Sequence, residues 1–410
     1  MNNADLIKLI KKQKLNFSLD QEFYTNDYIF DLDIKNIFSK QWVFVGHTSR
    51  IPNYGDYFLF NIGKESIIIV RDKDDSVHAH YNVCRHRGSQ ICLENEGNSK
   101  ALICPYHAWT YNLDGSLRGA RLMEKDFDKD QWSLHKCNSK IFEGLIFINL
   151  SDKPNNFEEF ISPTRKFIEF HGLSNAKIAH RQHYPTNGNW KLTLDNFHEC
   201  YHCQPSHPEY CQVHDKDYII AYGAGSNTGP VSEKFDNILT EWNNKVEKMG
   251  HLTGEYSEVE FNDYSRSAER TPLKEGMFTE TKSGKPISKL MGKFTDYDRG
   301  YTSVGTSPFN SLLMCNDFAT LFTFIPVSPL YTQVELMWLV HKDAEEGKDY
   351  NLEEMKWMWD VTTLADKRII EDNQKGVLSK KYIPGPLSQM EKGLDKFKTW
   401  YLKHLENSLI

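Results

Sequence analysis

Two short cysteine–histidine pairs constrain this chain more than any other feature of its sequence. Cys84 and His86 form a Cys-x-His pair, and Cys104 and His107 form a Cys-x-x-His pair after seventeen intervening residues. Thiolate and imidazole groups at such spacings are typical ligands of iron and zinc. The four side chains together therefore predict a metal centre carried by two loops.

The composition of the four ligands favours an iron–sulfur cluster over zinc. In a Rieske 2Fe–2S cluster, two cysteine sulfurs bind one iron and two histidine nitrogens bind the other. A structural zinc site also accepts mixed Cys and His ligands, and it is the alternative. Loop-forming residues beside the pairs, Arg87-Gly88 and Pro105-Tyr106, and the order of Cys before His in each pair favour the cluster. We therefore expect a redox protein.

Length, charge and hydropathy exclude several classes of protein. The 410 residues suggest two or three domains, and the net charge of −7 argues against nucleic-acid binding. No apolar run approaches the roughly 20 residues of a membrane helix, and the first residues lack a signal-peptide apolar region. We expect a cytoplasmic protein with no membrane partner. Disulfides are disfavoured there, so two of the eight cysteines are assigned to the cluster and six to buried thiols.

The spacing of apolar residues divides the chain into three parts of an α+β fold. Residues 1–41 have helix-like spacing and are expected to pack on the C-terminal domain. Residues 42–152 contain short β-rich runs between turn signals, which predicts an antiparallel β domain with the cluster ligands on two loops. Residues 153–410 mix strand-like runs with long helical stretches, which predicts a sheet packed against helices.

Individual elements are predicted within this frame. Strands are expected at 56–62, 66–72, 78–83, 108–113, 142–150, 318–326 and 332–341, and helices at 352–377 and 389–405. The polar stretch 236–300 is expected to form loops and short helices that cover a site.

A second set of metal-ligating residues lies in the string NWKLTLDNFHECYHCQPSHPEY. On a helix, Glu199 and His202 would share a face, and Pro205 would break the helix so that His207 returns toward His202. Two imidazoles and one carboxylate form the facial triad of non-haem Fe(II) oxygenases. The carboxylate must then come from another part of the chain.

Two other interpretations of this string are weaker. His202 and His207 are also compatible with ordinary histidines at a helix end. A zinc knuckle would use Cys200 and Cys203 with neighbouring histidines, but Cys200 and His202 would point apart on a helix. An iron–sulfur cluster upstream favours the iron site, because an electron carrier needs an acceptor.

The motifs together resemble a known family. From WVFVGH through NVCRHRGS, CPYHAWTYNLDG, GLIFINL and NFHECYHC to PGPLSQMEKG, the chain resembles the catalytic α subunit of Rieske non-haem iron oxygenases. The resemblance implies an N-terminal Rieske domain and a C-terminal helix-grip, START-like catalytic domain with an antiparallel sheet and long helices. It also implies a mononuclear Fe(II) site in the second domain.

The resemblance assigns roles to individual residues. It implies that His202 and His207 bind the iron, with Asp366, eight residues before Gln374, as the third ligand. It also implies that Glu199 bridges the two metal centres between subunits, and we favour His107 as its cluster-side partner. Three other acids share the late helix and remain alternatives to Asp366, namely Asp360, Glu371 and Asp372.

The resemblance further implies a terminal oxygenase that uses a small-molecule substrate, O₂ and electrons from NAD(P)H delivered by a separate reductase, and that assembles as a homotrimer. The stretch from Gly223 to Gly229 misses the dinucleotide-binding GxGxxG spacing, which agrees with a separate reductase. A non-catalytic electron carrier is disfavoured, because the second domain holds a full candidate triad.

Within the family, WLVHKDAEEGKDY and PGPLSQMEKG look most like the branch that acts on quaternary ammonium compounds such as glycine betaine. Hydroxylation of an N-methyl carbon would release formaldehyde and the demethylated amine. An aromatic-ring hydroxylating dioxygenase is the alternative. An aromatic cage for a cation has the following candidates: Phe197, Tyr201, Tyr210, Phe309, Trp357 and Trp359.

Overall fold

The computed structural model describes residues 1–223, 230–257 and 266–409, and the chain divides into two compact units. One unit comprises Met1–Phe38 together with Asn155–Ile410, and the other comprises Ser39–Pro154. The N-terminal helical segment belongs to the same unit as the C-terminal part of the chain.

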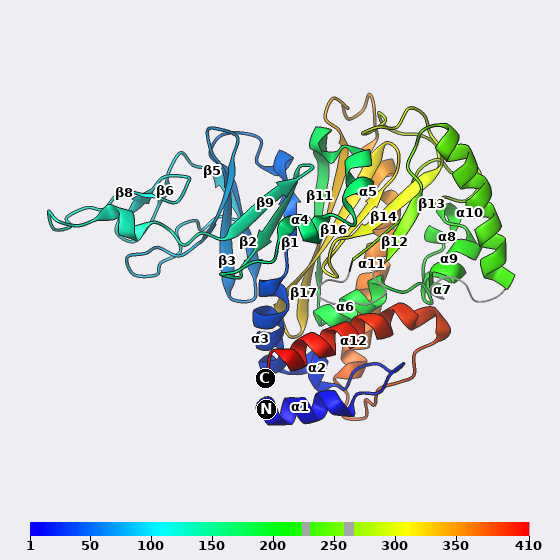
Figure 1. Ribbon diagram of the computed structural model, residues 1–410, viewed down its shortest axis with the longest axis horizontal. Coiled ribbons are helices and arrows are strands. Elements are labelled where there is room, and N and C mark those ends of the chain that lie inside the picture. Colours follow the sequence, from blue (N-terminus) through cyan, green and yellow to red (C-terminus); the bar gives the residue numbers. More distant parts are fainter. Residues whose placement is uncertain (224–229, 258–265, 410) are drawn as a thin grey trace. The chain divides into compact units, whose positions relative to one another are not determined.

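The unit Ser39–Pro154 consists of three antiparallel sheets (Figure 1). Their strand orders are β1-β10-β9, β4-β3-β2-β5 and β6-β7-β8. The strands are β1 Val43–His47, β2 Asp56–Ile62, β3 Glu65–Arg71, β4 Val77–Tyr81, β5 Glu96–Asn98, β6 Leu102–Ile103, β7 Thr110–Tyr111, β8 Leu117–Gly119, β9 Asn138–Phe142 and β10 Leu145–Asn149, with 3-10 turns η1 Phe38–Lys40, η2 Thr48–Arg50 and η3 Lys129–Trp132.

The two loops that carry the cysteine–histidine pairs share one backbone pattern. The Gly88 amide donates to the Cys84 carbonyl at 2.9 Å, and the Ala108 amide donates to the Cys104 carbonyl at 3.0 Å. The fourth residue after each cysteine has a positive φ, 79° at Gly88 and 59° at Ala108. Because Ala108 belongs to this turn, the strand expected at 108–113 shortens to Thr110–Tyr111.

The unit that contains residues 155–410 is built on one seven-stranded antiparallel sheet, with the order β11-β17-β16-β15-β14-β13-β12. Its strands are β11 Ala176–Thr186, β12 Gly254–Ser257, β13 Ser267–Pro272, β14 Gly300–Gly305, β15 Asn310–Met314, β16 Phe318–Ser328 and β17 Tyr331–His341. Strands β16 and β17 are buried over most of their length, as expected for the centre of a sheet that is packed against helices.

Helices accompany this sheet within the same unit (Figure 1). Helix α11 packs on β11 and α6, and α12 contacts α3. The helices are α1 Asn3–Lys12, α2 Glu22–Thr25, α3 Asp27–Asn36, α4 Phe157–Ile161, α5 Arg165–His171, α6 Trp190–Phe197, α7 Cys203–Ser206, α8 Tyr210–Val213, α9 Lys216–Gly223, α10 Pro230–Lys248, α11 Leu352–Val377 and α12 Lys392–Asn407, with 3-10 turns η4 Leu173–Asn175 and η5 Gln389–Glu391. None of the described helices is long and apolar enough to cross a membrane.

The prediction of loops and short helices over 236–300 is wrong in part. The 19-residue helix α10 runs from Pro230 to Lys248, and β12 and β13 follow it. Sparse apolar residues such as Trp242 and Val246 are enough to bury one face of this helix. Residues 258–265 of the predicted stretch lie outside the described residues, as does the glycine-containing stretch 224–229.

A buried ion pair holds the N-terminal segment to the helix that precedes the second histidine motif. Asp33 on α3 pairs with Lys191 on α6, and both side chains are fully buried. The Trp190 indole N–H donates to Asp33 Oδ2 at 3.0 Å, and the Tyr401 hydroxyl of α12 donates to Asp33 Oδ1 at 2.8 Å. Burial raises the pKa of Asp33 and lowers that of Lys191. These contacts join α3, α6 and α12 just before the segment that carries the second histidine motif.

Candidate metal centres and substrate pocket

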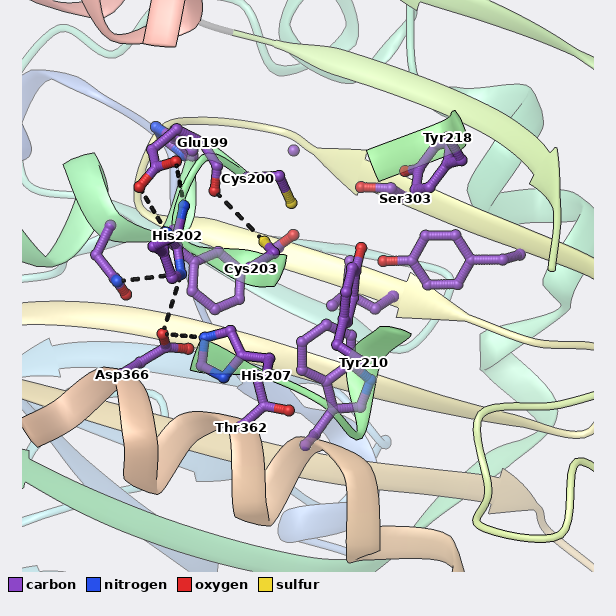
Figure 2. Close-up of a pocket in the computed structure, with 18 of the residues that line it drawn as sticks. Glu199, Cys200, His202, Cys203, His207, Tyr210, Tyr218, Ser303, Thr362 and Asp366 are labelled. Carbon is purple, nitrogen blue, oxygen red and sulfur yellow. Dashed lines mark hydrogen bonds and ion pairs between the residues drawn. The ribbon is translucent and has the colours of Figure 1, made fainter. Parts of the chain in front are cut away.

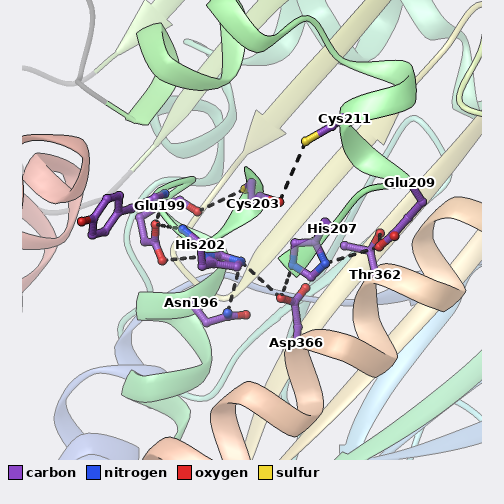
Figure 3. A network of polar contacts seen from close by, with 10 residues as sticks. Asn196, Glu199, His202, Cys203, His207, Glu209, Cys211, Thr362 and Asp366 are labelled. Carbon is purple, nitrogen blue, oxygen red and sulfur yellow. Dashed lines mark hydrogen bonds and ion pairs between the residues drawn. The ribbon is translucent and has the colours of Figure 1, made fainter. Parts of the chain in front are cut away.

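Three predicted iron ligands converge in the unit that contains the seven-stranded sheet (Figure 3). The Nε2 atoms of His207 and His202 lie 2.8 Å and 3.3 Å from Oδ1 of Asp366. The ligand atoms of the three residues all lie within 4.8 Å of one another. Residues 159 positions apart, His207 and Asp366, are thus brought into direct contact.

The local conformation of this site differs from the expected helix. Helix α6 ends at Phe197, so Glu199 and His202 lie in the turn between α6 and α7. Pro205 lies inside the short helix α7 and does not interrupt it, because proline is tolerated in the first helical turn. His207 caps the C-terminal end of α7, with its amide donating to the Cys203 carbonyl at 2.9 Å.

Helix α11 supplies the acid, and the structure distinguishes Asp366 from the alternatives on the same helix. Asp360 accepts a hydrogen bond from the Tyr184 hydroxyl at 2.6 Å, Glu371 bonds to the Asn187 amide, and Asp372 forms an exposed ion pair. Only Asp366 of these four acids contacts the two histidines. Asp366 lies one helical turn after Thr362 on the same face of α11, and the Thr362 hydroxyl donates to Glu209 at 3.2 Å.

The electrostatics of the site favour a positive charge between the two histidines and the carboxylates beside them. Burial lowers the pKa of His202, but hydrogen bonds to the Asp366 and Glu199 carboxylates raise it to about 10. Burial raises the pKa of Asp366, but hydrogen bonds from His202 and His207 hold it below its usual value. Carboxylates that stabilise an imidazolium at this position also stabilise a divalent cation in its place.

Glu199 contacts Nδ1 of the His202 ring, whereas Asp366 contacts Nε2 of the same ring (Figure 3). Glu199 Oε1 lies 2.5 Å from His202 Nδ1, and its Oε2 accepts from the backbone amides of Tyr201 and His202. A carboxylate on Nδ1 fixes the histidine tautomer and presents Nε2 as a metal ligand. Glu199 is therefore placed to orient His202 within its own subunit.

The donor set and its spacing fit a six-coordinate iron. Two imidazoles and one carboxylate form a facial triad that leaves coordination positions open. The ligand atoms of the three residues all lie within 4.8 Å of one another, close enough for one ion to contact all three. The residues therefore fit the metal that the sequence predicts.

In the smaller unit, the four predicted cluster ligands separate into a buried cysteine pair and a more exposed histidine pair. The Cys84 and Cys104 side chains are both 2% exposed, whereas the His86 and His107 rings lie nearer the surface with their Nδ1 atoms 3.1 Å apart. Burial raises the pKa of Cys84, the Tyr111 hydroxyl at 3.3 Å lowers it, and the adjacent Cys104 thiol raises it. A sulfur pair and a nitrogen pair fit the two irons of a Rieske cluster.

A pocket opens beside the three-residue site (Figure 2). Its floor comes from alternate residues of adjacent strands: Tyr301 and Ser303 on β14, Leu313 on β15 and Ser267 on β13. His202, His207 and Asp366 also line it. A molecule in the pocket therefore lies directly against the candidate metal ligands.

Three of the six aromatic residues proposed for a cation-binding cage line the pocket, and three do not. Phe197, Tyr210 and Trp359 line the pocket, and Tyr218 and Tyr301, which the sequence analysis missed, line it as well. The other three candidates lie elsewhere: Tyr201 is 57% exposed beside a second cavity, Phe309 stacks on Phe38 at 3.8 Å, and Trp357 does not line the pocket. Tyr301 was missed because only the strand register places it near the histidines.

Family models match both units. The Rieske [2Fe-2S] domain matches residues 41–136, and the catalytic domain of the ring-hydroxylating alpha subunit matches residues 173–407. The second match excludes a carrier that uses only its cluster domain. A 2Fe–2S cluster and a mononuclear iron are thus the cofactors of this chain, and a reductase supplies its electrons.

Curated relatives and solved structures agree with these models. The glycine betaine monooxygenase oxygenase subunit of Pseudomonas aeruginosa (strain UCBPP-PA14) is 35% identical over 98% of this chain and 92% of its own length. The carnitine monooxygenase oxygenase subunit of Escherichia coli (strain K12) is 38% identical over 47% of this chain and 53% of its own length.

Among solved structures, a quaternary ammonium Rieske monooxygenase aligns with a TM-score of 0.71 at 23% identity, covering 98% of this chain and 97% of its own. Naphthalene 1,2-dioxygenase from Rhodococcus sp. aligns with a TM-score of 0.62 at 20% identity, covering 98% of both chains. These likenesses establish the fold, an N-terminal Rieske domain followed by a catalytic domain with an antiparallel sheet. The chain belongs to the Rieske non-haem iron oxygenases, as the catalytic alpha subunit.

Proposed function

We propose that this chain is the terminal oxygenase of a multicomponent monooxygenase that hydroxylates an N-methyl group of a quaternary ammonium compound of the glycine betaine type. The observation that carries the proposal is an aromatic pocket directly beside the His202, His207 and Asp366 triad. Aromatic faces attract quaternary ammonium groups through cation–π interactions. The 35% identity with a glycine betaine monooxygenase subunit over 98% of the chain supports this substrate class over an aromatic ring.

Different residues of the chain have different roles in the reaction. His202, His207 and Asp366 hold the ferrous iron, and Glu199 fixes the orientation of His202. Iron bound there supplies the activation of O₂ when two electrons arrive from the reductase through the cluster. Tyr210, whose side chain is 7% exposed, helps to exclude water around the methyl groups.

The net reaction consumes one substrate, one O₂, two electrons and two protons. One oxygen atom enters a C–H bond of the N-methyl group, and the other leaves as water. The hydroxymethyl ammonium product then breaks its C–N bond, which releases formaldehyde and a proton and leaves the demethylated amine. Demethylation therefore needs no further oxidant.

The proposal includes a homotrimer in which the cluster of one subunit reduces the iron of its neighbour. Glu199 would bridge the centres, with one oxygen on His202 of its own subunit and a hydrogen bond to His107 of the cluster domain of a neighbouring subunit. Support comes from the position of Glu199, which lines both the pocket and a second cavity that includes the exposed Tyr201. Sedimentation of the holoprotein at the mass of three chains is the expected result.

The substrate class is tested with the holoprotein, a Rieske-oxygenase reductase and NADH. Methylated amines, including glycine betaine, carnitine, choline and stachydrine, are compared with aromatic acids for O₂ uptake and formaldehyde release. Formaldehyde with the amines alone supports the proposal, whereas O₂ uptake with dihydroxylated aromatic products contradicts it.

We also propose a cytoplasmic location, where NAD(P)H is available, to be checked by cell fractionation.

A further inference from the structure

A buried carboxylate behind the pocket wall takes no part in the iron site. Glu280 is 0% exposed, and its two oxygens contact two different rings. Oε1 lies 3.0 Å from Nε2 of His214, and Oε2 accepts a hydrogen bond from the Trp359 indole N–H at 3.0 Å. Because a buried carboxylate is costly without partners, two well-placed bonds at this position point to a defined role.

The two rings held by Glu280 orient three aromatic walls of the pocket. Trp359 lines the pocket itself. His214 stacks on Tyr210 with the ring centres 4.1 Å apart and meets Tyr301 edge-on at 4.9 Å. Tyr210 and Tyr301 also line the pocket, and Figure 2 labels Tyr210 among the residues drawn around it.

The loop that carries Glu280 is itself pinned to the sheet. Thr279 donates to Asp317 Oδ1 at 3.1 Å, and the backbone amides of Ile287 and Ser288 donate to Asp317 Oδ2 at 2.9 and 3.1 Å. Asp317 is fully buried in the turn between β15 and β16. The loop is therefore anchored near Glu280 and again seven residues beyond it, which fixes the carboxylate before substrate arrives.

We propose that Glu280 is a positioning residue for substrate recognition, which sets the Trp359, Tyr210 and Tyr301 walls so that the pocket accepts a quaternary ammonium head. The inference rests on the proposed function and names the residue that makes its pocket selective. An aromatic face attracts a cation only when the cation lies over it, so wall orientation decides affinity. The carboxylate behind the walls also attracts an ammonium head, whereas an uncharged tert-butyl head of the same shape does not feel this attraction.

The test compares glycine betaine with its carbon isostere, 3,3-dimethylbutanoate, which has the same shape without the ammonium charge. Binding of each to the anaerobic holoprotein is measured by calorimetry, and kcat and KM are measured with the reductase. Wild type should prefer the cation about tenfold. Glu280→Leu removes both hydrogen bonds and should lose this preference, with KM rising far more than kcat falls.

Two further variants complete the test. Glu280→Gln keeps the length and hydrogen-bonding capacity but removes the charge, so it should retain part of the preference, with KM raised about threefold. Glu275→Gln, on an exposed position of the same loop, should behave as wild type. If Glu280→Leu does not fold, as judged by circular dichroism and iron content, Glu280→Gln decides the question.

A cation preference within twofold of wild type in the folded Glu280 variants would overturn the inference. A wild type that releases formaldehyde from no methylated amine would instead overturn the proposed function. The two failures are distinct, because the first is a comparison among variants and the second concerns wild type alone.

Discussion

Shortening the Glu199 side chain by one methylene tests how that carboxylate acts on the iron site. Glu199 Oε1 lies 2.5 Å from His202 Nδ1. Aspartate reaches about 1.5 Å less, which leaves a gap of about 4 Å, outside hydrogen-bonding distance. Loss of such an orienting contact costs about 10–100-fold in metal affinity or activity. We therefore expect Glu199→Asp to lose the mononuclear iron at 10–100-fold lower chelator concentration than wild type.

Glutamine at the same position separates orientation from charge. Glu199→Gln keeps the reach to His202, so the mononuclear iron should be retained, while product formation slows because the negative charge between the centres is lost. Iron is measured after equilibration with graded chelator, and formaldehyde is measured in steady state. Glu353→Asp, an exposed acid on α11 with a side chain 77% exposed, is the matched control. Normal iron affinity in Glu199→Asp, or normal turnover in Glu199→Gln, would refute this role.

Three further predictions follow from the same geometry. His107→Ala should abolish the visible Rieske absorption, and an unchanged spectrum would show that the ligand set is wrong. Asp366→Ala should lower elemental iron from three atoms per chain to two, whereas Asp372→Ala on the exposed side of α11 should keep three; three irons in both variants would move the ligand elsewhere. Asp33→Ala leaves the buried Lys191 ammonium uncompensated and should lower the free energy of unfolding by about 3–5 kcal/mol; a loss below 1 kcal/mol in denaturant titration would contradict the buried pair.

Much of the architecture could be predicted because its signals are local. Apolar residues at helical intervals over 352–377 predict α11 at its observed bounds. The alternation of apolar and polar residues over 56–62 predicts β2. The role of Asp366 came from the family resemblance, and the structure brings its side chain to both histidines. Local periodicity was sufficient for the helix and the strand, whereas Asp366 required the family resemblance.

Other features depend on contacts that no local pattern encodes. The turn at Glu199–His202 replaces the expected helix because Glu199 accepts backbone amides that a continuing helix would use internally. Tyr301 reaches the pocket through the strand register, and Glu280 reaches Trp359 across 79 residues of sequence. Loops that are pinned by buried side chains cannot be placed by propensity alone.

The most direct test of the central claim is a single turnover of the holoprotein, prereduced and freed of reductase, with glycine betaine and O₂. Cluster absorption and formaldehyde are followed in the same sample. If the two units work as one oxygenase, cluster oxidation and formaldehyde should rise together, and Asp366→Ala should yield no formaldehyde while its cluster stays intact. Full cluster oxidation in wild type with no formaldehyde, or equal formaldehyde from the Asp366 variant, would contradict the account.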